Sequence, residues 1–296
     1  MQIDIHTLAV ALGVANLAQV VALYLQYRLD RTHSGIGWWV LGSVSFTLGF
    51  ACNYLRDFPV VGQMAIVGNT ALFVGGIILL YVGTLRFLGQ RERWRWLAGY
   101  WGAILALQIY FLYVQDSLRA RRVLYSFGVA VISLLIARAM RIYRTPRTGG
   151  ASAFLMWVFL VEGVYFAQTS VRALTIPVHE QLFANTASQA ATYLIALITG
   201  MLWTFGFILL VNQQLAAERQ QTIEELMIAA EQIKTLRGIV PICSGCKKIR
   251  DDRGYWEQLD AFVTRHTEAE FSHGICPDCM QRLYPGYAVD GGLAGE

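Results

Sequence analysis

Charged residues are scarce in this chain, and lysine is missing from most of it. Only 15% of the 296 residues are charged and 55% are hydrophobic, whereas roughly 25% of the residues in typical soluble domains are charged. Residues 1–212 hold nearly all the long apolar stretches, and residues 213–296 have the composition of a soluble protein. Because residues 1–212 contain no lysine, a retinal chromophore held there as a Schiff base is excluded.

The C-terminal part also lacks the basic surface that nucleic-acid binding requires. Residues 1–212 carry 15 arginines and 7 acidic residues, whereas residues 213–296 carry 9 basic and 13 acidic residues. A basic N-terminal part favours contact with anionic lipid head groups. The net negative charge of the C-terminal part argues against a nucleic-acid partner, because such partners need basic groups that replace counterions.

Seven stretches are long and apolar enough to cross a bilayer, at about 20 residues each. Their residues do not alternate as barrel strands do, and lipid tolerates only helices and closed barrels, so we expect seven transmembrane helices. Arg28, the first basic residue, follows an apolar run too long for a cleaved signal peptide, so the first stretch is expected to stay in the membrane. The predicted spans lie near 5–28, 36–55, 61–84, 94–114, 121–140, 153–174 and 188–211.

The arginines predict the orientation, because cytoplasmic loops are enriched in basic residues. The loops after the first, third and fifth spans hold ten arginines, against five on the opposite side. We therefore expect the N-terminus outside and the C-terminus in the cytoplasm. The ten are Arg28, Arg31, Arg86, Arg91, Arg93, Arg95, Arg138, Arg141, Arg144 and Arg147, and the five are Arg56, Arg119, Arg121, Arg122 and Arg172.

Residues 213–237 are predicted to form a connector helix, since this segment contains neither proline nor glycine. Its apolar residues recur at spacings of three, four and seven, which is typical of a heptad seam between paired helices. Two heptads fit a single surface helix equally well, so a homodimer stays one of two alternatives. The seam residues are Ile223, Leu226, Ala230, Ile233 and Val240.

Four of the five cysteines form two CxxC pairs that are separated by 29 residues. Each tight turn presents two thiolates to one point, and two turns complete the tetrahedral shell of a structural Zn²⁺ with no open position for water. Disulfides are disfavoured in a reducing cytoplasm, and a redox CxxC stays an alternative. The predicted ligands are Cys243, Cys246, Cys276 and Cys279, with His266 and His273 as less favoured replacements.

Residues 238–285 are too few for an independent hydrophobic core, and a structural metal is a common remedy at this size. A knuckle, a hairpin and a second knuckle that opens a helix resemble a treble-clef zinc finger, so we expect a small α+β module here. The predicted elements are a hairpin over Lys247–Trp256 with its turn at Asp251–Gly254, a helix over Trp256–His266, a short helix over Cys279–Tyr284 and a flexible end at 286–296.

The tail resembles a cysteine-rich module of bacterial signalling proteins. The resemblance is carried by Leu236–Trp256, Glu270–Cys279 and Leu283–Pro285. In those proteins the module typically stands at the C-terminus, behind sensory, receiver or kinase-associated domains. The resemblance implies a place in signal transduction.

Residues 1–212 more loosely resemble the seven-helix sensory halves of bacterial membrane diguanylate cyclases, through Phe46–Phe50 and Gly68–Thr70. No cyclase signature follows, nor a kinase-like phosphoacceptor histidine, nor a glycine pattern for nucleotides. The resemblance therefore implies sensing without a cyclase or kinase activity, and no hydrolase motif points to another enzyme.

Glu162 stands near the middle of the sixth span, where an ionisable side chain is costly and is a functional candidate. Tyr165 lies on about the same helix face, and Asn69 and Gln168 add polar groups. Together these residues predict a pocket for a small cationic or polar ligand. Hydrogen bonding between helices is the alternative.

The sequence and these resemblances together predict a sensor of the bacterial inner membrane that relays a membrane or extracellular stimulus to a zinc-bound module, which would dock a cytoplasmic signalling protein. A metal or thiol-redox sensor anchored in the membrane is one alternative. A small-solute transporter is another, although the spans show no repeat and no paired broken helices.

Overall fold

The computed structural model describes residues 5–56, 58, 61–146, 148–175, 187–234, 241–251, 253–266 and 269–285. The chain divides into two compact units, Met1–Arg219 and Gln220–Glu296. The predicted flexible end at 286–296 lies outside the described residues.

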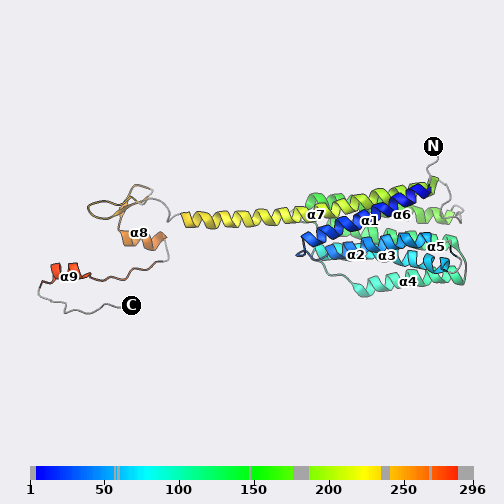
Figure 1. Ribbon diagram of the computed structural model, residues 1–296, viewed down its shortest axis with the longest axis horizontal. Coiled ribbons are helices and arrows are strands. Elements are labelled where there is room, and N and C mark those ends of the chain that lie inside the picture. Colours follow the sequence, from blue (N-terminus) through cyan, green and yellow to red (C-terminus); the bar gives the residue numbers. More distant parts are fainter. Residues whose placement is uncertain are drawn as a thin grey trace. The chain divides into compact units, whose positions relative to one another are not determined.

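The first unit is a bundle of helices that run side by side (Figure 1). Seven helices of the described part are long and apolar enough to cross a membrane, which confirms the predicted number of spans and the multi-pass membrane class. The bounds differ from the predicted ones by a few residues at most ends, apart from the last helix. They are α1 Ile5–Leu29, α2 Ile36–Tyr54, α3 Gly62–Phe87, α4 Trp94–Tyr113, α5 Leu118–Ile142, α6 Gly149–Thr175 and α7 Ala187–Lys234.

Glycines let α2 and α3 approach each other closely. A Cβ atom added at Gly42 would stand 2.9 Å from the carbonyl oxygen of Gly76, and one at Gly76 would stand 3.1 Å from the carbonyl oxygen of Gly42. In lipid there is no hydrophobic force between helices, so close packing of small residues is a main source of association. Close packing of the two backbones at Gly42 and Gly76 therefore stabilises the α2–α3 pair.

Aromatic rings fill the core between α2, α6 and α7. Trp39 of α2 stacks on Phe207 of α7 with ring centroids 4.1 Å apart, and Phe159 of α6 lies 5.9 Å from Phe207. All three side chains are fully buried. The first part of α7 thus belongs to the bundle.

The segment predicted as a connector helix continues the last span, and its described part belongs to α7. Helix α7 runs without a break over 48 residues, because nothing in the sequence from Phe207 to Lys234 can end a helix. Beyond the bundle its apolar residues Ile223 and Leu226 are 46% and 64% exposed. The seam prediction stays untested, and Val240 lies outside the described residues.

The predicted hairpin of the tail is confirmed. Strand β1 (Ile249–Arg250) pairs antiparallel with β2 (Trp256–Glu257). At the turn, Gly254 takes a positive φ of 86° and donates its N–H to the carbonyl oxygen of Asp251 at 3.0 Å. The Asp251 carboxylate also accepts the N–H of Tyr255 at 2.7 Å, which holds the turn closed.

The two short helices of the tail exist, but each begins elsewhere than predicted. Helix α8 covers Leu259–His266 and starts later, because Trp256 is taken into β2. Helix α9 covers Pro277–Leu283 and starts earlier, with Cys276 as its N-cap. Proline is favoured at a first helical position, since its missing N–H would be unpaired there anyway.

Candidate functional site

A polar cluster joins the α1–α2 loop to α7. Nδ1 of His33 lies 2.7 Å from Oδ2 of Asp30, and Nε2 of His33 lies 3.1 Å from Oε1 of Glu218 on α7. The same Glu218 oxygen accepts a hydrogen bond of 2.7 Å from Gln214, one turn earlier. We call Asp30, Thr32, His33, Gln214 and Glu218 the His33 cluster.

The local sequence builds the loop side of this cluster. Helix α1 ends at Leu29, and the next side chain, Asp30, folds back on its own backbone. Its Oδ1 atom accepts the N–H of Thr32 at 3.0 Å and the Thr32 hydroxyl at 2.6 Å. Such turns are typical of aspartate. Asp30 is only 4% exposed, so its charge needs the partners that Thr32 and His33 supply.

The cluster holds opposite charges. Burial by itself would lower the pKa of His33, but hydrogen bonds to Asp30 and Glu218 outweigh it and raise the pKa. Burial likewise opposes ionisation of Asp30, yet hydrogen bonds from Thr32 and His33 hold the pKa of that carboxyl below its usual value. The raised pKa favours the protonated form of His33, in which both ring nitrogens can donate to the two carboxylates.

A second network lies at the same end of the bundle. Arg86 at the end of α3 pairs with Glu92 and stacks 4.7 Å over the Trp38 ring. Glu92 also accepts the indole N–H of Trp94 at 2.9 Å. The Ser34 hydroxyl donates to the Arg86 carbonyl oxygen at 3.2 Å, which links this network to the loop of His33.

Glu162 of α6 is buried, as the sequence predicted. It is 9% exposed, and its Oε2 atom has no hydrogen-bond partner among the described residues. Tyr125 of α5 lies within electrostatic range of it. A buried polar atom without a partner is costly and calls for an explanation, so the ligand role of Glu162 stays a prediction that this finding supports.

The other candidate ligand residues have partners elsewhere or face outward. Asn69 donates to the Gly49 carbonyl oxygen at 2.8 Å and to the Asn53 side chain at 3.1 Å, both on α2. Tyr165 shares a hydrogen bond of 2.8 Å with Thr192 on α7, and Gln168 is exposed. Among the described residues, no hydrogen bond joins any of these side chains to Glu162. The contacts of Asn69 and Tyr165 fit the alternative, hydrogen bonding between helices.

Within each CxxC pair of the tail, the two cysteines are hydrogen-bonded to each other. Hydrogen bonds from the backbone N–H and the thiol of Cys246 lower the pKa of Cys243. Those from Cys279 likewise lower the pKa of Cys276. A lowered pKa favours the thiolate, which is the form that binds metals.

The two pairs are not brought together. Within the described ranges, no three or more His, Cys, Asp or Glu side chains form a group that could hold a metal ion. His266 is exposed, and its Nδ1 lies 2.8 Å from the Phe262 carbonyl oxygen; His273 is exposed too. The donor set thus suits zinc, but its placement does not form the predicted four-cysteine site or the treble-clef arrangement.

The described part of the tail has almost no core of its own. Ile249 is its one buried hydrophobic side chain, at 2% exposure. Larger side chains stay open to solvent, among them Trp256 at 49% and Phe271 at 46%. This agrees with the expectation that so short a segment needs a metal or a partner to bury its apolar groups.

The His33 cluster was not among the sites predicted from sequence. The one local signal for it is Asp30, three residues before His33 at the end of a predicted span. The contribution of Glu218 could not be read from sequence, since it stands 185 residues away.

Comparisons with protein-family models, curated proteins and solved structures found no match for this chain. The chemistry and geometry of its own residues are therefore what support a functional assignment.

Proposed function

We propose that this chain is a sensor of the bacterial inner membrane. In this proposal, the seven-helix half responds to a membrane or extracellular stimulus and α7 carries the response to the tail. The tail acts as a docking module for a cytoplasmic signalling protein. The resemblance of its cysteine-rich segment to bacterial signalling proteins supports this role.

One observation carries the proposal. Glu218 lies on α7 beyond the apolar part of the helix, and it is held by His33 from the α1–α2 loop at 3.1 Å. Helix α7 continues from there to Lys234 without interruption. A shift of α1 or α2 would therefore move Glu218, and the continuous helix α7 would pass this movement on to Lys234. Signal relay requires that the bundle has two conformations, one with α1 or α2 shifted and one without the shift.

Arginine placement supports the proposed orientation, with the His33 cluster and the tail on the cytoplasmic side. The end of the bundle that holds this cluster is also the end with ten of the fifteen arginines of residues 1–212. Glu162, buried and without a partner for its Oε2 atom among the described residues, is the proposed contact for a small ligand.

In the proposed tail, the four cysteines bind one Zn²⁺ when the module is fully assembled. The exposed apolar side chains of the tail and the exposed Ile223 and Leu226 of α7 support burial against partners. For α7 the proposed partner is a second copy of the same helix.

Hydrogen–deuterium exchange of the full chain in nanodiscs tests the relay. In a His33→Ala variant we expect faster exchange in residues 214–231 and altered exchange in the tail hairpin, because the link to Glu218 is lost. Two glycines inserted between Ala229 and Ala230 should keep the first effect and abolish the second, since glycine weakens a helix by roughly 1 kcal/mol.

Arg31→Ala is the matched control, because Arg31 belongs to the same loop, is exposed and has no described contact with α7. It should change neither region. If the tail hairpin of His33→Ala exchanges as in the wild type, the proposed relay is wrong.

A thiol-redox sensor is the second candidate. The observation in its favour is that the thiols of each CxxC pair are hydrogen-bonded to each other while the two pairs stay apart. A disulfide oxidant would convert each pair to a disulfide, with loss of two hydrogens from the pair and reduction of the oxidant to two thiols. Native mass spectrometry separates the candidates, because one zinc per tail supports the docking module and two disulfides support the redox sensor.

A further inference from the structure

A pocket opens at the end of the bundle between α3, α4 and α5. It has a volume of about 410 Å³, within the usual range of roughly 300–1,000 Å³ for small-ligand sites. Its polar lining comes from Tyr81, Gln90, Arg91, Arg93, Arg138 and Tyr143.

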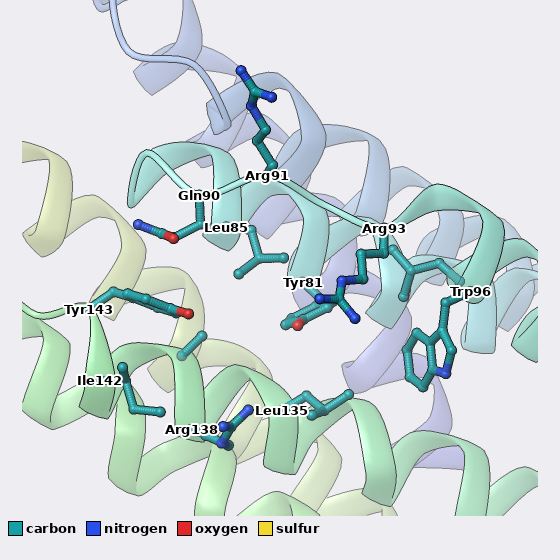
Figure 2. Close-up of a pocket in the computed structure, with 12 residues that line it drawn as sticks. Tyr81, Leu85, Gln90, Arg91, Arg93, Trp96, Leu135, Arg138, Ile142 and Tyr143 are labelled. Atoms are coloured by element: carbon teal, nitrogen blue, oxygen red, sulfur yellow. The ribbon is translucent and has the colours of Figure 1, made fainter.

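Two arginines from different elements lie near the centre of this pocket. Figure 2 shows Arg93, which precedes α4, and Arg138 of α5 on either side of Tyr81, while Arg91 extends away from them. Both guanidinium groups lie within electrostatic range of the Tyr81 hydroxyl, and so does Tyr143. The centre of the pocket therefore combines two positive charges with two hydroxyl groups.

Both guanidinium groups lack a carboxylate partner in the described part of the chain. Among the described residues, no carboxylate forms an ion pair with Arg93 or Arg138. The neighbouring Arg86, in contrast, pairs with Glu92. Two cations that act on the same hydroxyl group repel each other, and an anion between them would offset that repulsion.

The position of Arg138 within a membrane helix carries a free-energy cost, which a bound anion would reduce. It stands four residues before the end of α5 at Ile142, about 6 Å inside the helix end. A cation below the membrane surface is unfavourable unless it is paired. The pocket walls beside it are apolar, formed by Leu85, Leu135 and Ile142. A ligand with an anionic group joined to an apolar body fits both features.

We propose that this pocket binds the phosphate of an anionic membrane lipid, with Arg93 and Arg138 on the phosphate oxygens. The Tyr81 and Tyr143 hydroxyls donate to the same head group, and the acyl chains leave along the apolar wall towards the bilayer. Lipid binding at this pocket goes beyond the proposed sensor function, and neither proposal depends on the other.

The test measures phosphatidylglycerol binding to the full chain by native mass spectrometry, with phosphatidylcholine as the zwitterionic comparison. An Arg93→Gln/Arg138→Gln double variant should bind phosphatidylglycerol about 25-fold more weakly. This is about fivefold per guanidinium, since one basic residue near an anionic lipid surface contributes about 1 kcal/mol. Phosphatidylcholine binding should stay unchanged.

The matched control is Arg141→Gln/Arg144→Gln, which removes the same charge from the same end of the bundle. Both arginines are exposed, and neither lines the pocket. The control should keep wild-type affinity. An equal loss in both double variants would mean general attraction to a basic surface and would overturn the proposal.

Wild-type protein gives the decisive result if the double variant does not fold. Phosphatidylglycerol should raise the thermal midpoint in detergent, whereas inorganic phosphate and phosphatidylcholine should not. An equal rise with inorganic phosphate would assign the site to a soluble phosphate compound. Equal rises with both lipids, or none with either, would also rule out an anionic-lipid site.

Discussion

His33 connects the α1–α2 loop to α7 through charged groups. It bridges the buried Asp30 and the more exposed Glu218, so its positive charge is balanced on both sides. Because the pKa of His33 is raised in the folded protein, its stabilising effect is complete below the ordinary value of 6.5 and is lost as pH rises through the raised value. The pKa of Asp30 is lowered, so its effect is present above 3.8 and is lost on acidification.

We expect His33→Gln to reveal this window. Below pH 6.5, and above the range in which Asp30 takes up its proton, the wild type should be more stable than the variant by roughly 1–2 kcal/mol, because charge-assisted hydrogen bonds are lost. The difference should disappear at strongly alkaline pH. Thermal unfolding in detergent over a pH series measures it, with Arg31→Gln as the control that shows no such trend. A difference that grows with pH would contradict the assigned charge.

At the scale of elements, α2 and α3 approach each other closely through glycines. Gly42 and Gly76 face each other across the helix contact, and neither leaves space for a methyl group. On α4, by contrast, a Cβ atom at Gly102 would meet nothing within 4 Å. A methyl group should therefore be tolerated at Gly102 but not at Gly42, although both glycines lie in membrane helices.

Gly42→Ala should destabilise the bundle by about 1–3 kcal/mol, because the added methyl overlaps the Gly76 carbonyl oxygen and the helices must move apart. Gly102→Ala should be neutral or slightly stabilising, since alanine is the better helix former. Thermal unfolding of both variants in the same detergent makes the comparison. Equal stability of the two would show that α2 and α3 do not pack through their glycines.

At the scale of the whole molecule, the membrane bundle and the tail form separate compact units. The bundle has an extensive aromatic core, whereas Ile249 is the one buried hydrophobic side chain of the described part of the tail. Stability of the tail should consequently depend on what it binds, and stability of the bundle should not.

Cys243→Ser and Cys276→Ser should each abolish zinc binding, because three thiolates leave the tetrahedral shell incomplete. Each should also expose the tail to proteolysis while the thermal midpoint of the bundle stays unchanged. Cys52→Ser is the matched control, since Cys52 lies in α2 and not in the tail, and it should keep one zinc per chain. Unchanged zinc content in the tail variants would show that these cysteines are not the ligands.

The sequence by itself determined which segments enter the membrane. Length and hydropathy are local properties, and lipid forces each apolar stretch into a helix, so the seven spans could be predicted without knowledge of their neighbours. The hairpin turn at Asp251–Gly254 was equally local, because aspartate and glycine favour that backbone geometry wherever they stand. The helix predicted for residues 213–237 was local too, because no proline or glycine stands there to end it, and its described part, up to Lys234, continues the last span.

Only the tertiary structure decided which side chains meet. The contact of His33 with Glu218, the approach of Gly42 to Gly76 and the arginine pair around Tyr81 each join segments that are distant in the chain. Such contacts depend on how helices rotate and cross, which is set by packing over the whole bundle. Composition and spacing could identify Glu162 as a buried carboxyl, but only packing against α5 decided that its Oε2 atom has no partner among the described residues.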